Sequence, residues 1–161
     1  IHFPHWDIVK HLTSKVPWPY PPDGAEQFLN NIVLPKMARG EMYGWAICKR
    51  EKPNELIGSI SYCFTEPKEL RRGFWLAREH HGQGYMTQAV CLVQDFLFFS
   101  CNLGEIHMMN AVENIASRRI KEKTGATYVG TIDFGHLSGG IQSEVWKCTR
   151  KDWATFRQKN K

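Results

Sequence analysis

The spacing of apolar residues before Gly40 predicts two short helices separated by a rigid loop. The loop is residues 16–22, Val-Pro-Trp-Pro-Tyr-Pro-Pro. Proline fixes φ and has no N–H to donate, so this stretch suits neither a regular helix nor a central strand. Asp23 is the candidate N-cap of the second helix. Its apolar side chains recur at helical spacing at Phe28, Leu29, Ile32 and Val33.

Extended segments follow, with a period of two. Residues 43–48 and 56–64 are rich in β-forming residues and flank a predicted turn at 52–55, which indicates a hairpin. Residues 70–76 follow after a short polar connection and provide a third strand. We therefore expect an antiparallel meander of three strands.

The second half alternates helices and strands. After Gly82-Gln83-Gly84, apolar residues cover more than half the circumference of a predicted helix at 87–99, which Asn102-Leu103-Gly104 ends. A strand at 105–112 should follow by a parallel crossover. Asn114 and Gly125 are recognised signals for the start and end of the next helix. Strands at 127–133 and 142–149 complete one predicted domain spanning residues 1–161.

Composition narrows the class of protein. The chain has 161 residues, 42% hydrophobic and 23% charged, and no apolar stretch approaches the roughly 18 to 20 residues that span a bilayer. Five scattered cysteines without CxxC spacing suggest free thiols, and we expect a soluble cytoplasmic protein without a metal site. The net charge of +5 is too moderate to indicate nucleic-acid binding. The basic group on one predicted helix suits a small polyanion: Arg118, Arg119, Lys121 and Lys123.

The Gly82-x-Gly84 turn is the clearest chemical signal. Where a strand runs through glycines into a helix, successive backbone N–H groups point at one spot near the positive end of the helix, and phosphate binds there. A plain tight turn is the alternative. The turn is not a P-loop, because GK[ST] is missing, and Thr87 replaces the third glycine of a dinucleotide fingerprint.

Residues 73–89, GFWLAREHHGQGYMTQA, resemble the acetyl-CoA motif of the GNAT superfamily, especially its RimJ/RimL-like branch. Residues 114–126, NIASRRIKEKTGA, are similar to that family's N-x-x-S...EK-x-G helix. The resemblance extends from about Pro17 to Trp153 and implies an α+β, three-layer fold with a mixed, mostly antiparallel sheet. His81 and Met86 depart from the usual motif, and the family's first strand is not evident before Ile1.

The resemblance implies direct transfer of an acetyl group from acetyl-CoA to an amine, with no metal. The backbone N–H near Leu76 would then stabilise the oxyanion. Ser117 would protonate or hydrogen-bond the departing thiolate, although a serine in a first turn also bonds the helix backbone. Asn114 is either an N-cap or a ligand contact. The residues expected to hold acetyl-CoA are Trp75, Leu76, His81, Gly82, Gln83, Gly84, Tyr85, Met86, Thr87 and Asn114.

The general base is open among several residues. His136 lies near the position where relatives carry a carboxylate, and Asp133 is the closest carboxylate to it in sequence. His107 and Glu105 are alternatives acting through water, and either histidine can instead be structural. His80 and His81 are adjacent, so their side chains point apart and do not suggest a metal site.

Three functions are compatible with these residues. The acceptor is the N-terminal amine of a protein such as a ribosomal protein, or a small amine such as a polyamine, aminoglycoside or amino acid; otherwise the chain binds acyl-CoA without catalysis. An α-amino group with pKa about 8 costs only about 1.4 kcal/mol to deprotonate at pH 7, against about 4.6 for a lysine. The 16–22 loop is a candidate wall of the acceptor site, and a homodimer is possible.

Overall fold

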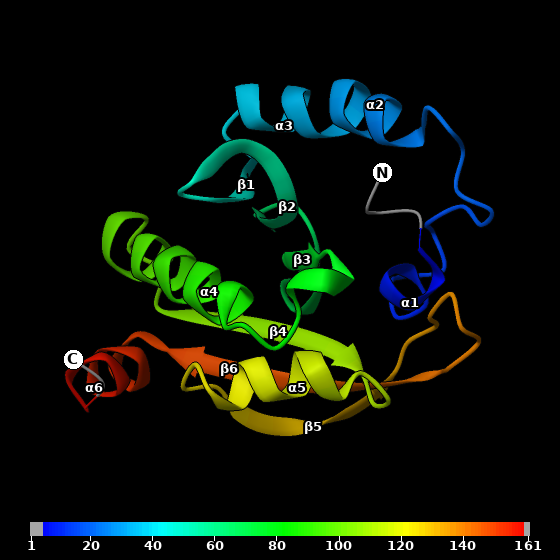
Figure 1. Ribbon diagram of the computed structural model, residues 1–161. Coiled ribbons are helices and arrows are strands. Elements are labelled where there is room, and N and C mark those ends of the chain that lie inside the picture. The colour runs from blue at the N-terminus through cyan, green and yellow to red at the C-terminus, as the bar shows by residue number, and fades with distance from the viewer. Residues whose placement is uncertain (1–4, 160–161) are drawn as a thin grey trace.

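The computed structural model describes residues 5–159 and contains two three-stranded antiparallel sheets (Figure 1). The predicted α+β class is confirmed. In the first sheet the order is β1-β2-β3, with β1 Met42–Lys49, β2 Lys52–Cys63 and β3 Arg72–Leu76. In the second the order is β4-β6-β5, with β4 Glu105–Ala111, β5 Thr127–Asp133 and β6 Gln142–Thr149. The ends of the predicted 1–161 domain, including the position before Ile1, lie outside the described residues.

The predicted parallel crossover is wrong in one respect. α4 does connect β3 to β4, but the two strands belong to different sheets, and the strand pairs in residues 5–159 are all antiparallel. The hydrophobic cluster that joins the sheets includes Leu76 of β3, Met86 of α4 and Met108 of β4. Side-chain packing therefore replaces a backbone ladder at this point.

The predicted hairpin forms, but its turn is displaced. Lys49 pairs with Lys52, so the turn is Arg50-Glu51 and residues 52–55 belong to β2. Pro53 is tolerated there because β3 pairs with β2 only from Gly58 to Tyr62, which leaves that end of β2 with one open edge. The register between β1 and β2 also shifts between Ile47 and Lys49, so the pairing next to this turn is irregular.

The first segment contains α1, Trp6–Val9, and a longer helical stretch made of α2, Gly24–Phe28, a π-helical turn, Leu29–Val33, and α3, Leu34–Ala38. This stretch arches over the first sheet (Figure 1). Asp23 does not cap it with its side chain, because its ψ of 1° departs from the extended geometry of an N-cap. The Asp23 carboxylate instead accepts a hydrogen bond from Gln27 Nε2 at 2.6 Å.

The remaining helices follow β3 along the chain. α4, Tyr85–Asp95, continues through a π-helical segment, Phe96–Ser100, and α5 is Ile115–Glu122. Short 3₁₀ turns at Lys68–Leu70 and Arg78–His80 flank β3. The sequence pattern missed α6, Arg150–Lys159, because polar residues occupy most of it and Trp153 is its one buried residue. No helix of the described part is both long and apolar enough to cross a membrane.

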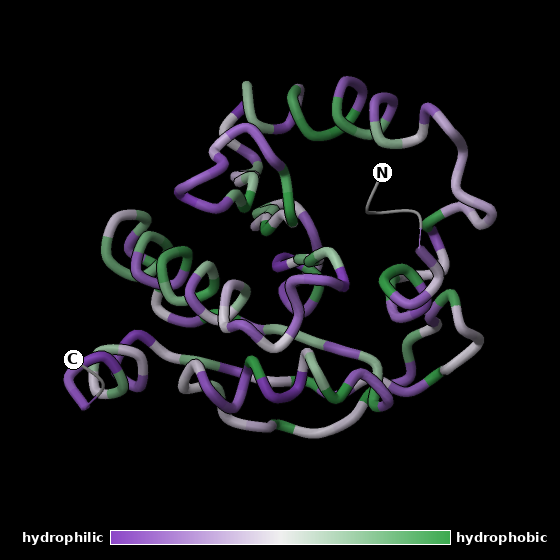
Figure 2. The backbone as a smooth tube through the Cα atoms, viewed as in Figure 1, coloured by the Kyte–Doolittle hydropathy of each residue, from purple (hydrophilic) through white to green (hydrophobic). Residues whose placement is uncertain are grey.

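The core lies where α4 meets both sheets. The hydropathy colouring shows apolar residues along α4 and its continuation (Figure 2). Val90 and Leu97 from this helix are fully buried with Ile57 of β2 and Ile106 of β4. Each fully buried aliphatic side chain of this kind stabilises the fold by about 2 kcal/mol. This core fixes the N-terminal end of α4 against the end of β3, which is where the glycine turn lies.

Candidate active site

A cleft of about 680 Å³ opens between the end of β3, the glycine turn, α1 and the start of α5. It brings together ten of the residues singled out from the sequence. They are Trp75, Leu76, His81, Gly82, Gly84, Tyr85, Met86, Thr87, Asn114 and Ser117. Residues from two distant parts of the chain therefore share one cavity.

The glycine turn has the backbone that an anion cradle needs. Gly82 and Gly84 have φ values of 75° and 83°, a region that glycine enters at little cost. Gly84 is the N-cap of α4, so the helix begins at Tyr85, two residues earlier than predicted. The residues of this first turn, 85–87, line the cleft, and a first helical turn has N–H groups without intrahelical partners and a dipole that favours negative charge. Met86 is 5% exposed and anchors the turn in the core.

Two side chains of the motif brace the turn itself. His81 Nε2 lies 2.9 Å from the carbonyl oxygen of Leu76 and ties the turn to the end of β3. Gln83 Nε2 donates to the carbonyl of Glu79 at 2.9 Å. Gln83 is not among the residues that line the cleft. The side chains of His81 and Gln83 therefore support the backbone geometry, and both remain predicted acetyl-CoA residues.

The start of α5 carries the second part of the site. Asn114 Oδ1 accepts the N–H of Ser117 at 3.0 Å, so the predicted N-cap is confirmed. Gly125, with φ of 74°, follows the helix in the left-handed region as expected. Ser117 is among the residues that line the cleft, although it is only 7% exposed, and its hydroxyl oxygen accepts a hydrogen bond from Lys121 Nζ at 2.7 Å. Ser117 therefore lies at the boundary between the cleft and the buried amine of Lys121.

The predicted bases lie elsewhere. His136 is 6% exposed, and its Nε2 lies 2.7 Å from the hydroxyl of Ser143. Burial lowers the pKa of His136. On β4, His107 Nε2 lies 2.8 Å from Glu105 Oε1. None of these residues, nor Asp133, lines the cleft, and the catalytic role of His136 stays a prediction.

The sequence analysis missed the contribution of the N-terminal segment. Asp7, Lys10 and His11 line the cleft, as does Glu113 from the connection between β4 and α5. Burial lowers the pKa of His11, which favours the neutral imidazole that a general base requires. No local pattern marks His11, because its place is set by contacts between residues 10–12 and residues 137–138.

The basic group predicted to face a polyanion is divided by the fold. Arg119 and Lys123 line the cleft, whereas Arg118 pairs with Glu144 at 2.5 Å and Lys121 is buried. Lys10, which follows α1, and Arg78, which follows β3, also line the cleft and add positive charge, and both pair with Asp7. The cleft retains a cationic rim, but from four residues of which only two were in the predicted group.

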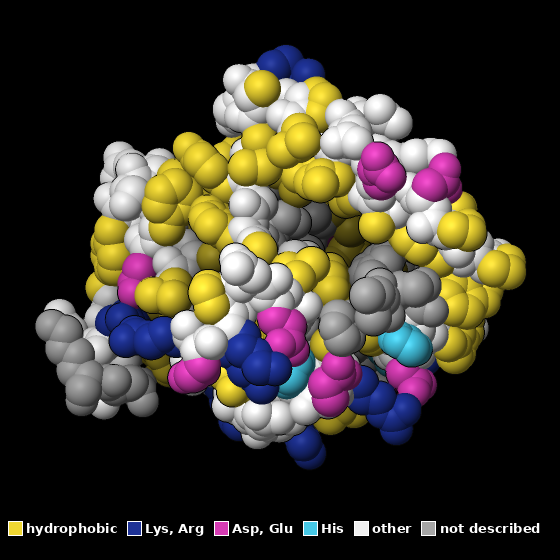
Figure 3. Space-filling model, turned by 45° about the horizontal axis from the view of Figure 1, so that its top comes forward, with side chains coloured by type: hydrophobic (Ala, Val, Ile, Leu, Met, Phe, Trp, Pro, Cys, Tyr) yellow, Lys and Arg dark blue, Asp and Glu magenta, His cyan; other side chains and the backbone are white. Residues whose placement is uncertain are grey.

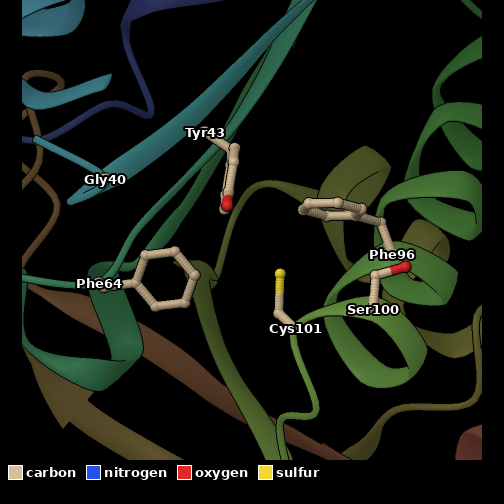
Figure 4. A pocket seen from close by; sticks show the side chains of 6 residues that line it. All are labelled: Gly40, Tyr43, Phe64, Phe96, Ser100 and Cys101. Carbon is tan, nitrogen blue, oxygen red and sulfur yellow. The ribbon is translucent and has the colours of Figure 1, made fainter. Parts of the chain in front are cut away.

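A second, smaller pocket of about 380 Å³ lies at the other end of α4. Aromatic side chains from Tyr43, Phe64 and Phe96 surround the Cys101 thiol there (Figure 4). Burial raises the pKa of Cys101, which keeps the thiol protonated and poorly nucleophilic. This pocket offers no charged group and is remote from the glycine turn.

Comparison with known proteins agrees with this geometry. The family described as "Acetyltransferase (GNAT) domain" matches residues 2–127. The curated probable N-acetyltransferase YjcK of Bacillus subtilis (strain 168) is 40% identical over 75 residues, covering 45% of this chain and 41% of that relative. The chain thus spans less than half of the curated relative that it matches.

Solved structures share the fold. The ribosomal-protein-S5-alanine acetyltransferase of Vibrio fischeri has a TM-score of 0.75 at 19% identity, over 94% of this chain and 86% of that one. Mycobacterium smegmatis RimJ in complex with CoA-disulfide has a TM-score of 0.75 at 17% identity, over 91% and 72%. Spermidine N-acetyltransferase from Vibrio cholerae in complex with CoA and spermine has a TM-score of 0.74 at 18% identity, over 95% and 88%. Since the family match covers most of the sequence, this chain belongs to the GNAT acetyltransferase family.

Proposed function

We propose that this protein transfers the acetyl group of acetyl-CoA directly to a primary amine. The observation that carries the proposal is that the Gly82–Gly84 turn and Ser117 open into one cleft. The turn has backbone N–H groups suited to phosphate, and Ser117 lines the same cavity. A volume of about 680 Å³ falls within the usual range for a small-molecule site.

The residues present fit a polyanionic cosubstrate. Lys10, Arg78, Arg119 and Lys123 supply positive charge around the cleft, against the carboxylates of Asp7 and Glu113. A Cβ atom added at Gly82 would meet no neighbouring atom within 4 Å, so a ligand can approach the backbone there. Met86 in place of the usual small residue does not obstruct this approach, because its side chain is buried.

We assign the chemical roles as follows. The backbone N–H near Leu76 donates to the developing oxyanion, and Ser117 donates to the sulfur that leaves. For the base, His136 remains the candidate from sequence, and His11 is a second candidate because it lies in the cleft. Geometry favours His11, since a base must reach the proton that it removes.

For the acceptor we favour the N-terminal α-amine of a protein over a polyamine. Among the described residues only two carboxylates line the cleft, and one of them, Asp7, already pairs with Lys10 and Arg78, so few anionic groups are left to hold a polycationic acceptor. An α-amine also needs little help to lose its proton near neutral pH. The solved neighbours include both acceptor classes, so a polyamine is retained as the alternative.

The test is to incubate the protein with acetyl-CoA and a panel of acceptors, and to follow the release of free thiol. The panel should contain peptides with free N-terminal Ala or Ser, the same peptides with blocked N-termini, and spermidine. We expect turnover only with the free peptides. Turnover only with spermidine would transfer the assignment to small amines, and tight CoA binding without any turnover would leave a non-catalytic binding module. Replacing His11 and His136 separately by Ala identifies the base.

A further inference from the structure

Lys121 is a buried cation placed directly behind Ser117. Its side chain is 1% exposed, and Nζ donates to Ser117 Oγ at 2.7 Å. The two residues are four apart on α5, so they lie on the same face of the helix. Ser117 lines the cleft and Lys121 does not, which places the amine one hydrogen bond away from any ligand that contacts the serine.

The loss of hydration on burial makes a lysine unfavourable at this position. A buried ammonium loses its hydration, and a hydrophobic side chain of similar size generally costs less at such a site. The backbone carbonyl of Ser117 adds only a long contact of 3.5 Å to Lys121 Nζ. The Phe74 ring, whose centroid lies 6.0 Å from Nζ, gives weak compensation.

The charges around Lys121 work against its protonated form. Arg72 of β3 is also buried and approaches the same Phe74 ring at 5.7 Å. Glu144 of β6 is the opposing charge, but Arg118, Asn110 and Trp146 already donate to its carboxylate. Burial, followed by the repulsion from Arg72, holds the pKa of Lys121 well below its usual range, and Glu144 offsets this only in part. The protonated amine therefore gives up its proton more readily than that of an ordinary lysine.

We propose that Lys121 is a positioning residue that supplies a proton through Ser117 to the sulfur of departing CoA. As the carbon–sulfur bond breaks, the sulfur keeps the electron pair and takes the hydroxyl proton of Ser117. Ser117 Oγ takes a proton from Lys121 Nζ, which becomes a neutral amine. Water in the cleft then returns a proton to Lys121 through Ser117. This inference rests on the proposed acetyl transfer and adds a residue that the family motif did not single out.

Turnover of matched variants tests this pathway. Lys121→Met keeps the length of the side chain and removes the amine, and we expect kcat to fall about tenfold, at the low end of general-acid effects, with KM for acetyl-CoA unchanged. In the Ser117→Ala background the same substitution should have no further effect. A purely structural lysine would give equal losses in both backgrounds, or none, and either result would overturn the proposal.

The pH profile separates this role from a packing effect. Because Lys121 must be protonated to donate, kcat of the unmodified enzyme should decline as pH rises through the lowered pKa of Lys121. Lys121→Met should lack that decline. Lys123→Met is the matched control on the same helix: it removes a cation of the cleft rim and should raise KM for acetyl-CoA while the decline persists.

A final measurement needs no acceptor. Ultraviolet absorbance of the thiolate reports the pKa of the thiol of CoA bound to the protein. That pKa should be lower in the unmodified protein than in Lys121→Met, with no such difference in the Ser117→Ala background. Equal values would reject the Lys121 pathway while CoA binding stands. Failure of CoA to bind at all would reject the proposed function as well.

Discussion

At the scale of single residues, the site depends on backbone conformations that few side chains tolerate. Gly84 has a φ of 83° and is followed at once by the first turn of α4. A Cβ at this position strains the backbone by about 1 kcal/mol, because the left-handed region crowds Cβ against the following carbonyl. In a Gly84→Ala variant this strain would also tilt the backbone N–H groups that we assign to phosphate binding.

Gly84→Ala should therefore weaken CoA binding about tenfold, the loss of roughly one charge-assisted hydrogen bond. Gly40→Ala is the matched control, since Gly40 has a φ of 70° and a Cβ added there meets nothing within 4 Å, whereas at Gly84 it meets only Gln88 Nε2 in ordinary contact at 3.9 Å. We expect similar losses of unfolding free energy in both variants by urea denaturation. Calorimetry should show weakened CoA binding in Gly84→Ala alone, and equal CoA affinities in the two variants would contradict the cradle.

Residues with local signals were predictable from the sequence. Asn114 and Gly125 act within a few positions of themselves, and both behave as expected. His11 had no such signal, because it reaches the cleft through pairing of its segment with the loop that follows β5. Lys121 belongs to the basic group that the sequence assigns to a small polyanion, and helical spacing alone does not reveal that this cation faces the core.

At the scale of elements, α5 connects the cleft to the second sheet. Arg118 on this helix donates from Nε to Glu144 of β6 at 3.0 Å, and Glu144 is only 7% exposed. Burial alone would raise the pKa of Glu144, but the hydrogen bonds from Arg118 and Asn110 and the charge of Arg118 lower it overall. The ion pair therefore stabilises α5 on β6 above the ordinary pKa of a glutamate, and this stability is lost as pH falls through the lowered value.

Arg118→Met should reduce the free energy of unfolding by about 2 kcal/mol at neutral pH, because it leaves a buried carboxylate short of donors. The Glu144 pKa should rise in this variant, so its acid unfolding should begin at higher pH. Denaturant titrations at several pH values check both points. Arg119→Met, on the cleft side of the same helix, serves as the control and should change stability little.

Predictability at this scale followed the strength of the apolar pattern. The strands at 127–133 and 142–149 have the predicted bounds, and α4 and α5 lie where their apolar or capping signals placed them. The hairpin turn was misplaced because Pro53 suggests a turn, whereas the open edge of β2 accommodates it within the strand. α6 was not predicted, because a single buried tryptophan in a polar segment gives no periodic pattern of apolar residues.

At the scale of the whole molecule, α6 closes the core against α4. Trp153 is fully buried, and its Nε1 donates to Asp95 Oδ1 at 2.8 Å. Arg157 pairs with the other oxygen of Asp95 at 3.0 Å. The helix at the end of the described chain is thus attached to the middle of the sequence by both packing and charge.

Trp153→Phe should cost about 1 kcal/mol of unfolding free energy, since it removes one hydrogen bond and keeps most of the ring contact. Trp153→Ala should cost about 4 kcal/mol, because a large cavity opens beside Phe98 and Phe156. Thermal and urea unfolding measure both. If the two variants lose the same free energy of unfolding, packing of the Trp153 ring does not attach α6 to the core.

The arrangement of the two sheets was not accessible from the sequence. A strand, a helix and a second strand in series ordinarily form a parallel pair, and nothing local reports that β3 and β4 separate. The surface is hollowed on the face beside the first helical stretch, with hydrophobic side chains around the opening (Figure 3). Such a space arises only from how distant elements pack.

Separate sheets also mean that β3 and β4 are each an edge strand within the described part of the chain. Edge strands carry backbone groups free to pair with another extended chain, which makes them sites of aggregation as well as of recognition. An extended, amide-bearing ligand arm lying along β3 would occupy those groups as an added strand does. We therefore expect the protein without its cosubstrate to self-associate more readily during storage than the protein with the cosubstrate bound. Adding the cosubstrate should then keep the protein in solution.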